Sequence, residues 1–155
     1  MNKPYPETIQ VGLIPVTGKI RSQVEVLELA PSQVNLVASN TESLLEADDD
    51  ANARPKAIFV AGKLVGFLMY DATSEPGVAQ LYRFMIDKSF QGRGYGKAAL
   101  QAAIEEIRTL SHVRQISICY EPENIAAQQL YAKAGFIEEG LDEDGEMIAH
   151  LNLQD

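Results

Sequence analysis

The stretch Gln91-Gly92-Arg93-Gly94-Tyr95-Gly96-Lys97 decides how this chain is interpreted. It lies between a predicted strand and a predicted helix, and its three glycines remove side chains where backbone must approach a ligand closely. The start of a helix offers unpaired N–H groups and the positive end of the helix dipole, and the Arg93 and Lys97 side chains add charge. The stretch therefore predicts a site for an anion such as a diphosphate, with a purely structural turn as the alternative.

Two nucleotide-binding folds also use glycine-rich loops, and this sequence fits neither of them well. A P-loop requires Ser or Thr after its Gly-Lys pair, but Gly96-Lys97 is followed by Ala98. A dinucleotide-binding fold places its loop after the first strand of a βαβ unit, with an acidic residue about 20 positions further on. Here the loop follows a late strand of a meander, and Glu121 ends the next strand.

Outward from the loop, the hydrophobic pattern predicts a mixed sheet with helices on its faces. The expected strands are residues 24–29, 57–60, 64–70, 78–86, 115–120, 136–137 and 146–153. The expected helices are residues 31–38, a short helix capped by Asn40 or Thr41 and ending at Ala47, a helix from the loop to Leu110, and residues 124–134. Prolines and glycines interrupt residues 1–20, which we expect to be an irregular N-terminal arm before a single domain, residues 21–155.

Two motifs in register carry a resemblance to a known family. Gln91-x-x-Gly94-x-Gly96 resembles the pyrophosphate loop of the GNAT superfamily of N-acetyltransferases, and Asn124-x-x-Ala127-x-x-Leu130-Tyr131-x-x-x-Gly135-Phe136 is similar to its other signature segment. The resemblance covers roughly residues 57–153. It implies a GNAT-like α/β fold (α+β mixed), with a central mixed, mostly antiparallel sheet of about six to seven strands flanked by about four helices. It also implies acetyl transfer from acetyl-CoA to a primary amine by direct attack in a ternary complex.

Within the superfamily, the chain is most similar to bacterial diamine/spermidine/spermine N-acetyltransferases. The similar stretches are residues 64–70, 83–87 and 91–96 and the Gly145-Glu146 turn, with residues 33–47 matching more loosely. The resemblance implies a polyamine acceptor. The loop also fits two alternatives. One is an enzyme that acetylates a protein N-terminus, an amino acid or an aminoglycoside, and the other is a catalytically silent sensor that binds acyl-CoA.

The resemblance implies where acetyl-CoA binds. Backbone groups of Met85 and Ile86 would pair with the pantetheine arm like an added strand. Asn124 either caps its helix or hydrogen-bonds the same arm. The implied cofactor-binding residues are Met85, Ile86, Gln91, Gly92, Arg93, Gly94, Tyr95, Gly96, Lys97, Asn124 and Ala127.

The resemblance also implies catalytic roles. Tyr131 matches the tyrosine that donates a proton to the departing CoA thiolate. Glu121, beside the proposed acetyl site, is the first candidate for general base, with a solvated carboxylate at a strand end as the alternative. Some eukaryotic polyamine acetyltransferases carry a glutamate where this chain has Tyr82, so we expect Tyr82 to line the acceptor channel instead. We expect Cys119 to be a small buried residue and not a nucleophile, because no histidine lies near it in sequence.

A second ammonium group of a polyamine needs an anionic partner. Glu42, Glu46 and Asp48 lie in the early helical segment that would cover the acceptor side, and each is otherwise a solvated face residue. A second acidic cluster is expected to be a solvated turn; it consists of Glu138, Glu139, Asp142, Glu143, Asp144 and Glu146.

Composition excludes several other functions. The net charge of −9 argues against nucleic-acid binding, which needs a basic face, and favours a cationic ligand or simply solubility. One cysteine and two widely separated histidines predict no disulfide and no metal site. No apolar run is long enough to cross a membrane and no signal-peptide pattern precedes it, so we expect a cytoplasmic protein without membrane partners. Family resemblance alone favours a homodimer.

Overall fold

The computed structural model describes residues 9–31 and 39–153, which form a seven-stranded mixed sheet in the order β1-β2-β3-β4-β5-β7-β6. The strands are β1 Val11–Pro15, β2 Arg54–Val60, β3 Lys63–Glu75, β4 Val78–Ile86, β5 Gln115–Tyr120, β6 Ile137–Leu141 and β7 Met147–Asn152. The α-helices of the described residues are α1 Gly18–Glu25, α2 Asn40–Asp48, α3 Tyr95–Arg108 and α4 Ile125–Lys133. This architecture confirms the expected fold class.

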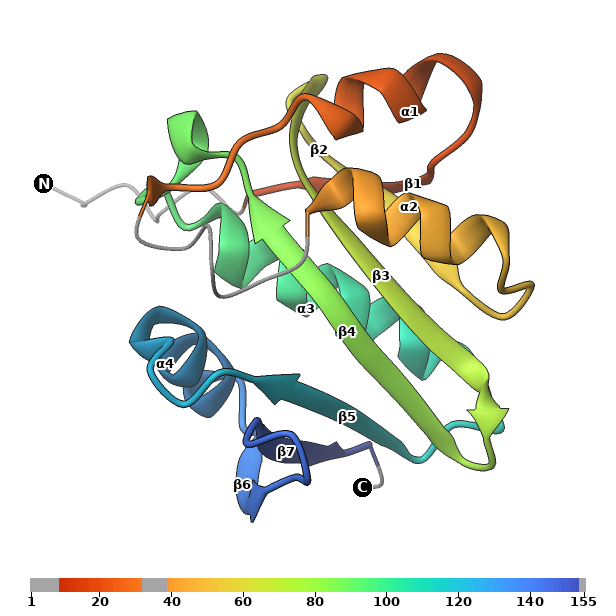
Figure 1. The fold of residues 1–155 in the computed structure, drawn as a ribbon, viewed down its shortest axis with the longest axis vertical. Helices are drawn as coiled ribbons and strands as arrows, with labels where there is room; N and C mark the ends of the chain where they lie inside the picture. Colours follow the sequence, from red (N-terminus) through yellow and green to blue (C-terminus); the bar gives the residue numbers. More distant parts are fainter. Residues whose placement is uncertain (1–8, 32–38, 154–155) are drawn as a thin grey trace, which may run out of the picture.

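The sheet separates two hydrophobic cores, because successive residues of a strand point to opposite faces. Along β3, Phe67 and Met69 pack into the cluster that holds Val24 of α1 and Leu44 of α2. Their neighbours Leu68 and Tyr70 enter the larger cluster, to which α3 contributes a stripe of apolar residues. Figure 1 shows α1 and α2 on the near face of β2 to β4 and α3 behind the sheet.

The strands β4 and β5 are parallel neighbours for only part of their length. Their pairing begins at Val78 with Gln115 and ends at Leu81 with Ile118, whereas β4 continues along β3 as far as Ile86. The β3–β4 register shifts where Met69 pairs with Arg83 and Tyr70 with Leu81, so Tyr82 is the extra residue of a bulge. A bulge bends its strand, and Figure 1 shows β4 and β5 diverging toward the end that holds α4.

The N-terminal part differs from the sequence-based expectation. Residues 11–15, expected in an irregular arm, form an edge strand antiparallel to β2, with Val11 opposite Val60 and Pro15 opposite Lys56. Proline is tolerated there because an edge strand has one side without partners, and Pro15 ends it. The prediction of a strand at residues 24–29 is also wrong, since Val24 lies in the last turn of α1.

The second helix lies where the sequence places it, but its cap is one residue earlier. Ser39, and not Asn40 or Thr41, is the N-cap, and its side chain accepts a hydrogen bond from the Glu42 amide at 3.1 Å. The helix expected at residues 31–38 falls outside the described residues, apart from Pro31. Downstream, the strands predicted at 78–86 and 115–120 are confirmed at both ends.

Replacing Gly66 of β3 by alanine tests the close approach of β3 to β4. A Cβ atom at this position would lie 2.3 Å from the carbonyl oxygen of Met85, so the two strands would have to shift. We expect Gly66→Ala to lower the free energy of unfolding by about 1–3 kcal/mol, measured by urea denaturation. Gly12→Ala in β1, where nothing lies within 4 Å, is the matched control and should change stability by less than about 0.5 kcal/mol. Equal, small effects of the two substitutions would contradict the β3–β4 packing.

Candidate active site

The divergence of β4 from β5 opens two connected cavities. One, of about 360 Å³, reaches from the end of β5 to α2, and the other, of about 190 Å³, reaches the glycine-rich loop. The residues that line both are Phe84, Met85, Asn124, Ala127 and Tyr131. The two cavities therefore form a continuous cleft, and we call them the acceptor cavity and the loop cavity.

The glycine-rich loop is held in place at the end of β4. The Gln91 side chain donates to the carbonyl oxygen of Ile86 at 2.9 Å. Just before the loop, the Asp87 carboxylate accepts hydrogen bonds from the amides of Glu28 at 2.7 Å and Ser89 at 3.0 Å. These contacts fix the loop relative to the strand edge, so the side chain of Gln91 has a structural task besides any contact with a cofactor.

The conformation of the loop requires glycine at two positions. Gly92 and Gly94 have φ angles of +78° and +83°, in the left-handed region that side chains disfavour. Gly94 is the N-cap of α3. The first hydrogen bond of the helix runs from the Ala98 amide to the Gly94 carbonyl oxygen, at 3.1 Å. The amides of Tyr95, Gly96 and Lys97 consequently have no acceptor within the helix, as at any helix start.

The two basic side chains of the loop lie on its outside. Arg93 is exposed and stacks over the Phe90 ring, with its guanidinium carbon 5.7 Å from the ring centre. Lys97 is exposed and borders a further hollow between α3 and α4, which Lys133 also lines. Positive charge therefore gathers around the free amides, as an anion site needs.

The start of α4 places two predicted residues in both cavities. The Asn124 side-chain oxygen accepts a hydrogen bond from the Ala127 amide at 3.1 Å, so Asn124 is the N-cap of α4. The cap uses only the oxygen. Among the described residues, its NH₂ group has no acceptor, and this group can still donate to a ligand in either cavity.

Tyr131 lies where the two cavities meet. Its ring stacks on Tyr120 with ring centres 5.7 Å apart and packs edge-on against Phe136, which leaves the residue 8% exposed. Within the described parts of the chain nothing hydrogen-bonds its hydroxyl, and that oxygen is not sealed from solvent, so it opens onto the cleft. Burial, followed by the neighbouring Tyr120, raises the pKa of Tyr131 far above its usual range, so the group keeps its proton.

The acceptor cavity contains the predicted Tyr82 and Glu121, and it also contains Cys119 and Glu146, for which the sequence predicted other surroundings. Cys119 is exposed and not buried, because its side chain points from the end of β5 toward the cavity. Partial desolvation of the thiol against the cavity wall, followed by the negative charges of Glu146 and Asp142, raises the pKa of Cys119, which disfavours a nucleophilic thiolate.

Glu146 was expected in a solvated turn, but it lines the cavity beside the end of β5. Partial burial, and then the charges of Glu121, Asp142 and Asp144, raise its pKa, while Arg83 acts in the opposite direction. The sequence offered only the Gly145-Glu146 pair as a sign that Glu146 lines the cavity. No other local pattern could show it, because the direction in which a hairpin turn points depends on how its strands pair.

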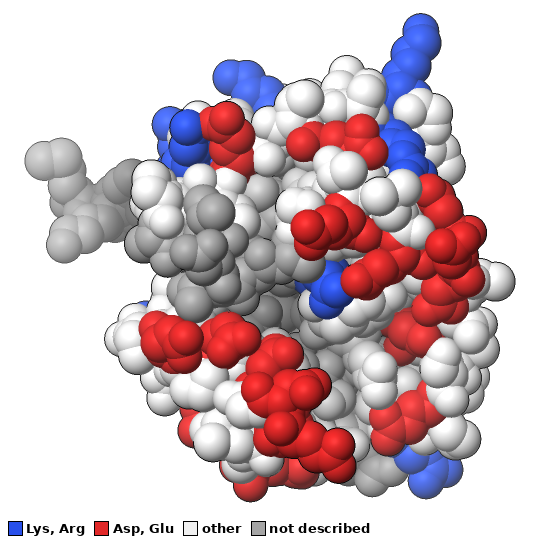
Figure 2. Space-filling model, in the orientation of Figure 1, with Lys and Arg blue, Asp and Glu red and all other residues white. Residues whose placement is uncertain are grey.

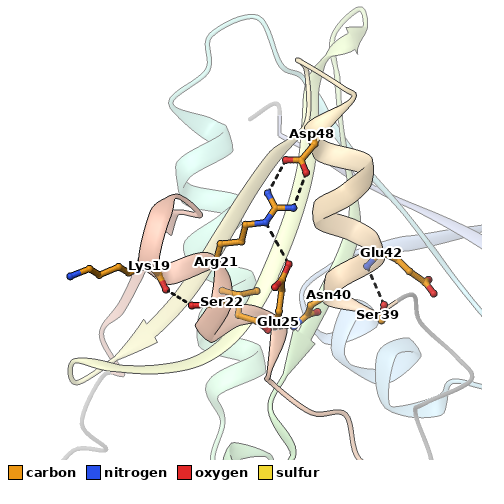
Figure 3. A network of polar contacts seen from close by, with 9 residues as sticks. Lys19, Arg21, Ser22, Glu25, Ser39, Asn40, Glu42 and Asp48 are labelled. Atoms are coloured by element: carbon orange, nitrogen blue, oxygen red, sulfur yellow. Dashed lines mark hydrogen bonds and ion pairs between the residues drawn. The ribbon is translucent and has the colours of Figure 1, made fainter.

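The predicted acidic ligands of α2 are placed differently. Neither Glu42 nor Glu46 is among the described residues that line the acceptor cavity. Both carboxylate oxygens of Glu46 accept hydrogen bonds from Arg83, at 2.9 and 3.1 Å. Asp48 accepts two hydrogen bonds from Arg21 at 2.8 Å, which ties α2 to α1 (Figure 3). The Glu46 side chain thus holds Arg83 of the cavity wall in place, whereas Asp48 joins α2 to α1 away from the described lining.

Acidic side chains gather around the cleft on the face shown in Figure 2, on both sides of a central hollow. A cleft that joins free helix-start amides to a protonated tyrosine and an acidic second cavity fits one class of enzyme. This class is the transferases that take a group from a carrier with an anionic diphosphate and pass it to a second substrate.

Comparison with known proteins makes this class specific. The sequence profile of the acetyltransferase (GNAT) family matches residues 25–136. A spermine/spermidine N(1)-acetyltransferase of Bacillus subtilis is 31% identical over 147 residues, which cover 90% of this chain and 97% of the relative. A probable spermine N(1)-acetyltransferase of Bacillus subtilis subsp. natto matches with the same identity and coverage. The chain belongs to the GNAT acetyltransferase family, and it is an acetyl-CoA-dependent N-acetyltransferase.

Solved structures share the fold. An acetyltransferase from Thermus thermophilus superposes with a TM-score of 0.77 at 23% identity, over 94% of this chain and 99% of that one. The spermidine N-acetyltransferase from Vibrio cholerae, solved with CoA and spermine, superposes with a TM-score of 0.74 at 18% identity, over 92% and 95% of the two chains.

Replacing Gly94 by alanine separates the role of the loop from its stability. The left-handed φ should cost about 1–2 kcal/mol in stability, and relief of that strain would turn the amides of the α3 start away from the loop cavity. We expect calorimetry to show CoA binding that is weaker by about tenfold or more. Gly62→Ala in the β2–β3 turn, at a φ of +78°, is the matched control: it should lose similar stability and keep normal CoA affinity. Equal CoA affinity of both variants would remove the loop from the binding site.

Proposed function

We propose that this acetyltransferase transfers the acetyl group of acetyl-CoA to a primary amine of a polyamine such as spermidine or spermine. The observation that supports this acceptor best is the charge of the acceptor cavity. Glu121 and Glu146 line it, and its one cationic side chain among the described lining residues, Arg83, is paired with Glu46. The similarity to the Bacillus spermine/spermidine acetyltransferase over nearly the whole chain agrees with this assignment.

Acetyl-CoA would occupy the loop cavity and the start of the acceptor cavity. Beyond Leu81, β4 has no partner in β5, so its outward-facing backbone groups near Met85 and Ile86 form an edge to which the amide-containing pantetheine arm can pair. The Ile86 carbonyl oxygen on this stretch is already bound by the Gln91 side chain. The diphosphate would receive hydrogen bonds from the first amides of α3. The thioester would then lie near Tyr131, where both cavities meet.

The amine must lose a proton before it attacks. A primary amine has a pKa near 10.4, so the neutral form costs about 4.6 kcal/mol at pH 7, from roughly 1.36 kcal/mol per pKa unit. Glu121 lines the acceptor cavity and is our candidate to take this proton, directly or through a water molecule.

The chemical step then has two parts. The amine nitrogen attacks the thioester carbonyl carbon, and backbone donors near Met85 stabilise the resulting oxyanion. As the tetrahedral intermediate collapses, the carbon–sulfur bond breaks and the Tyr131 hydroxyl donates its proton to the departing thiolate. The nitrogen, positively charged after the attack, gives up its remaining extra proton as the amide forms, and this proton restores the Tyr131 hydroxyl directly or through water. Because burial keeps this hydroxyl protonated, the acid is in the required state before each cycle.

Location and assembly stay predictions. In the described parts of the chain no helix has the length and apolar character needed to cross a membrane. We retain the cytoplasm as the expected location and a homodimer as the expected assembly.

A panel of amines tests the acceptor. CoA release from acetyl-CoA would be measured with spermidine, spermine, putrescine, an aminoglycoside, amino acids and a peptide with a free N-terminus. We expect the highest kcat/KM with a polyamine, because the cavity attracts multiple positive charges. Preference for an amino acid, peptide or aminoglycoside would contradict the polyamine assignment, and no release with any amine would favour a silent acyl-CoA sensor.

The substitution Tyr131→Phe tests the general acid. We expect kcat to fall by about 10²- to 10⁴-fold while acetyl-CoA affinity stays near normal, since only the proton donor is removed. Tyr70→Phe is a control in the core, where the lost hydroxyl donates to Glu106 and lines neither cavity. It should lower stability and leave kcat unchanged. Unchanged turnover in Tyr131→Phe would remove Tyr131 from its role.

A further inference from the structure

Asn40 is a buried polar residue with one unused atom. Its side chain belongs to the first turn of α2, is 7% exposed, and lines the acceptor cavity. The NH₂ group donates to the Val24 carbonyl oxygen at 2.9 Å and to the Met85 sulfur at 3.6 Å. The Val24 carbonyl oxygen can only accept a hydrogen bond, so the NH₂ group of Asn40 must face it. The side-chain oxygen of Asn40 must therefore point away from Val24.

The Asn40 oxygen therefore opens onto the cavity. In the described ranges no donor reaches this oxygen. Every fully buried side-chain oxygen of those ranges does have a hydrogen-bond partner, so the Asn40 oxygen must be accessible to solvent. A polar oxygen held in a buried, fixed orientation is a ready hydrogen-bond acceptor for a ligand that donates N–H groups.

Glu146 approaches the cavity from the other side of the cleft. Its backbone is fixed by two hydrogen bonds with Asp142: its amide donates to the carboxylate at 2.9 Å, and its carbonyl oxygen accepts from the Asp142 amide at 2.8 Å. In the described chain no hydrogen bond or ion pair involves its side-chain carboxylate. It comes just before β7, which pairs with β5, whereas Asn40 contacts β4, so the two line the cavity from its opposite walls.

The neighbouring groups make a cation the fitting partner for Glu146. Glu121 at the end of β5 and Asp142 and Asp144 of its own turn are negative, and Cys119 carries no charge. Among the described residues that line the cavity, Arg83 of β4 is the one opposing charge, and its donors are already engaged. They bind the Ser43 hydroxyl at 3.0 Å, the Tyr82 carbonyl oxygen at 2.9 Å and the Glu46 carboxylate.

We propose that Glu146 binds the protonated nitrogen of the polyamine that does not react with acetyl-CoA. On the facing wall, the side-chain oxygen of Asn40 accepts an N–H hydrogen bond from the same polyamine. The inference rests on the proposed function, and it moves the anionic ligand from α2, where the sequence placed it, to the β6–β7 turn. Glu146 is then a specificity-determining residue that selects diamines and polyamines over monoamines. A monoamine gains nothing from Glu146, since its single nitrogen is the one that reacts.

The test compares Glu146→Gln with the wild-type enzyme on spermidine and on butylamine. We expect KM for spermidine to rise by about 10- to 100-fold, as for loss of a charge-assisted hydrogen bond, with kcat changed by less than about threefold. KM for butylamine and for acetyl-CoA should not change. Glu146→Asp, which keeps the charge, should restore part of the spermidine affinity.

The matched control is Glu143→Gln, in the same turn, exposed and outside the cavity lining. It removes the same charge and should leave every parameter unchanged, which separates a specific contact from a general effect of net charge. An unchanged KM for spermidine in Glu146→Gln, or an equal rise for spermidine and butylamine, overturns the inference while the proposed function stands. A wild-type enzyme that acetylates butylamine but no diamine or polyamine refutes the proposed function, and the Glu146 subsite with it.

Discussion

The departure of β5 from β4 beyond the Leu81–Ile118 pair is the constraint on which the rest of the structure depends. Parallel strands normally continue side by side, since every unpaired backbone group must otherwise find another partner. Here the bulge at Tyr82 bends β4 while β3 still pairs with it as far as Ile86. The sheet therefore opens without losing its rigid support, and one strand edge is left free inside a cleft. The Gly66 position allows this, because only a residue without a side chain fits against the Met85 carbonyl oxygen.

Charge is distributed unevenly along that cleft, and the distribution matches two different substrates. At one end lie the free amides of the α3 start and the exposed Arg93 and Lys97, which suit an anionic diphosphate. At the other end Glu121 and Glu146 face a cavity whose only described cation, Arg83, is held by Glu46. Acidic side chains also lie on two sides of the opening on the face shown in Figure 2. The two ends meet at Tyr131, so an anionic donor and a cationic acceptor would each reach the same hydroxyl from its own side.

The sequence predicted local features well and placements poorly. Strands β4 and β5 and the loop between β4 and α3 follow from short-range patterns of branched residues and glycines, and the structure confirms them. The edge strand β1 was missed because proline and glycine usually interrupt strands, and an edge position relaxes that rule. Glu46 and Glu146 were misplaced for a different reason. Which carboxylate meets Arg83 and which enters the cavity depends on how distant elements pack, and one sequence does not encode that in any local pattern.

The most direct test of the account is a crystal structure of the protein with bound CoA. We expect the diphosphate within hydrogen-bonding distance of the amides at the start of α3. The pantetheine arm should lie along the free edge of β4, with its thiol beside Tyr131. CoA bound elsewhere, or a complex in which β5 pairs with β4 as far as Ile86 and closes the cleft, would contradict it.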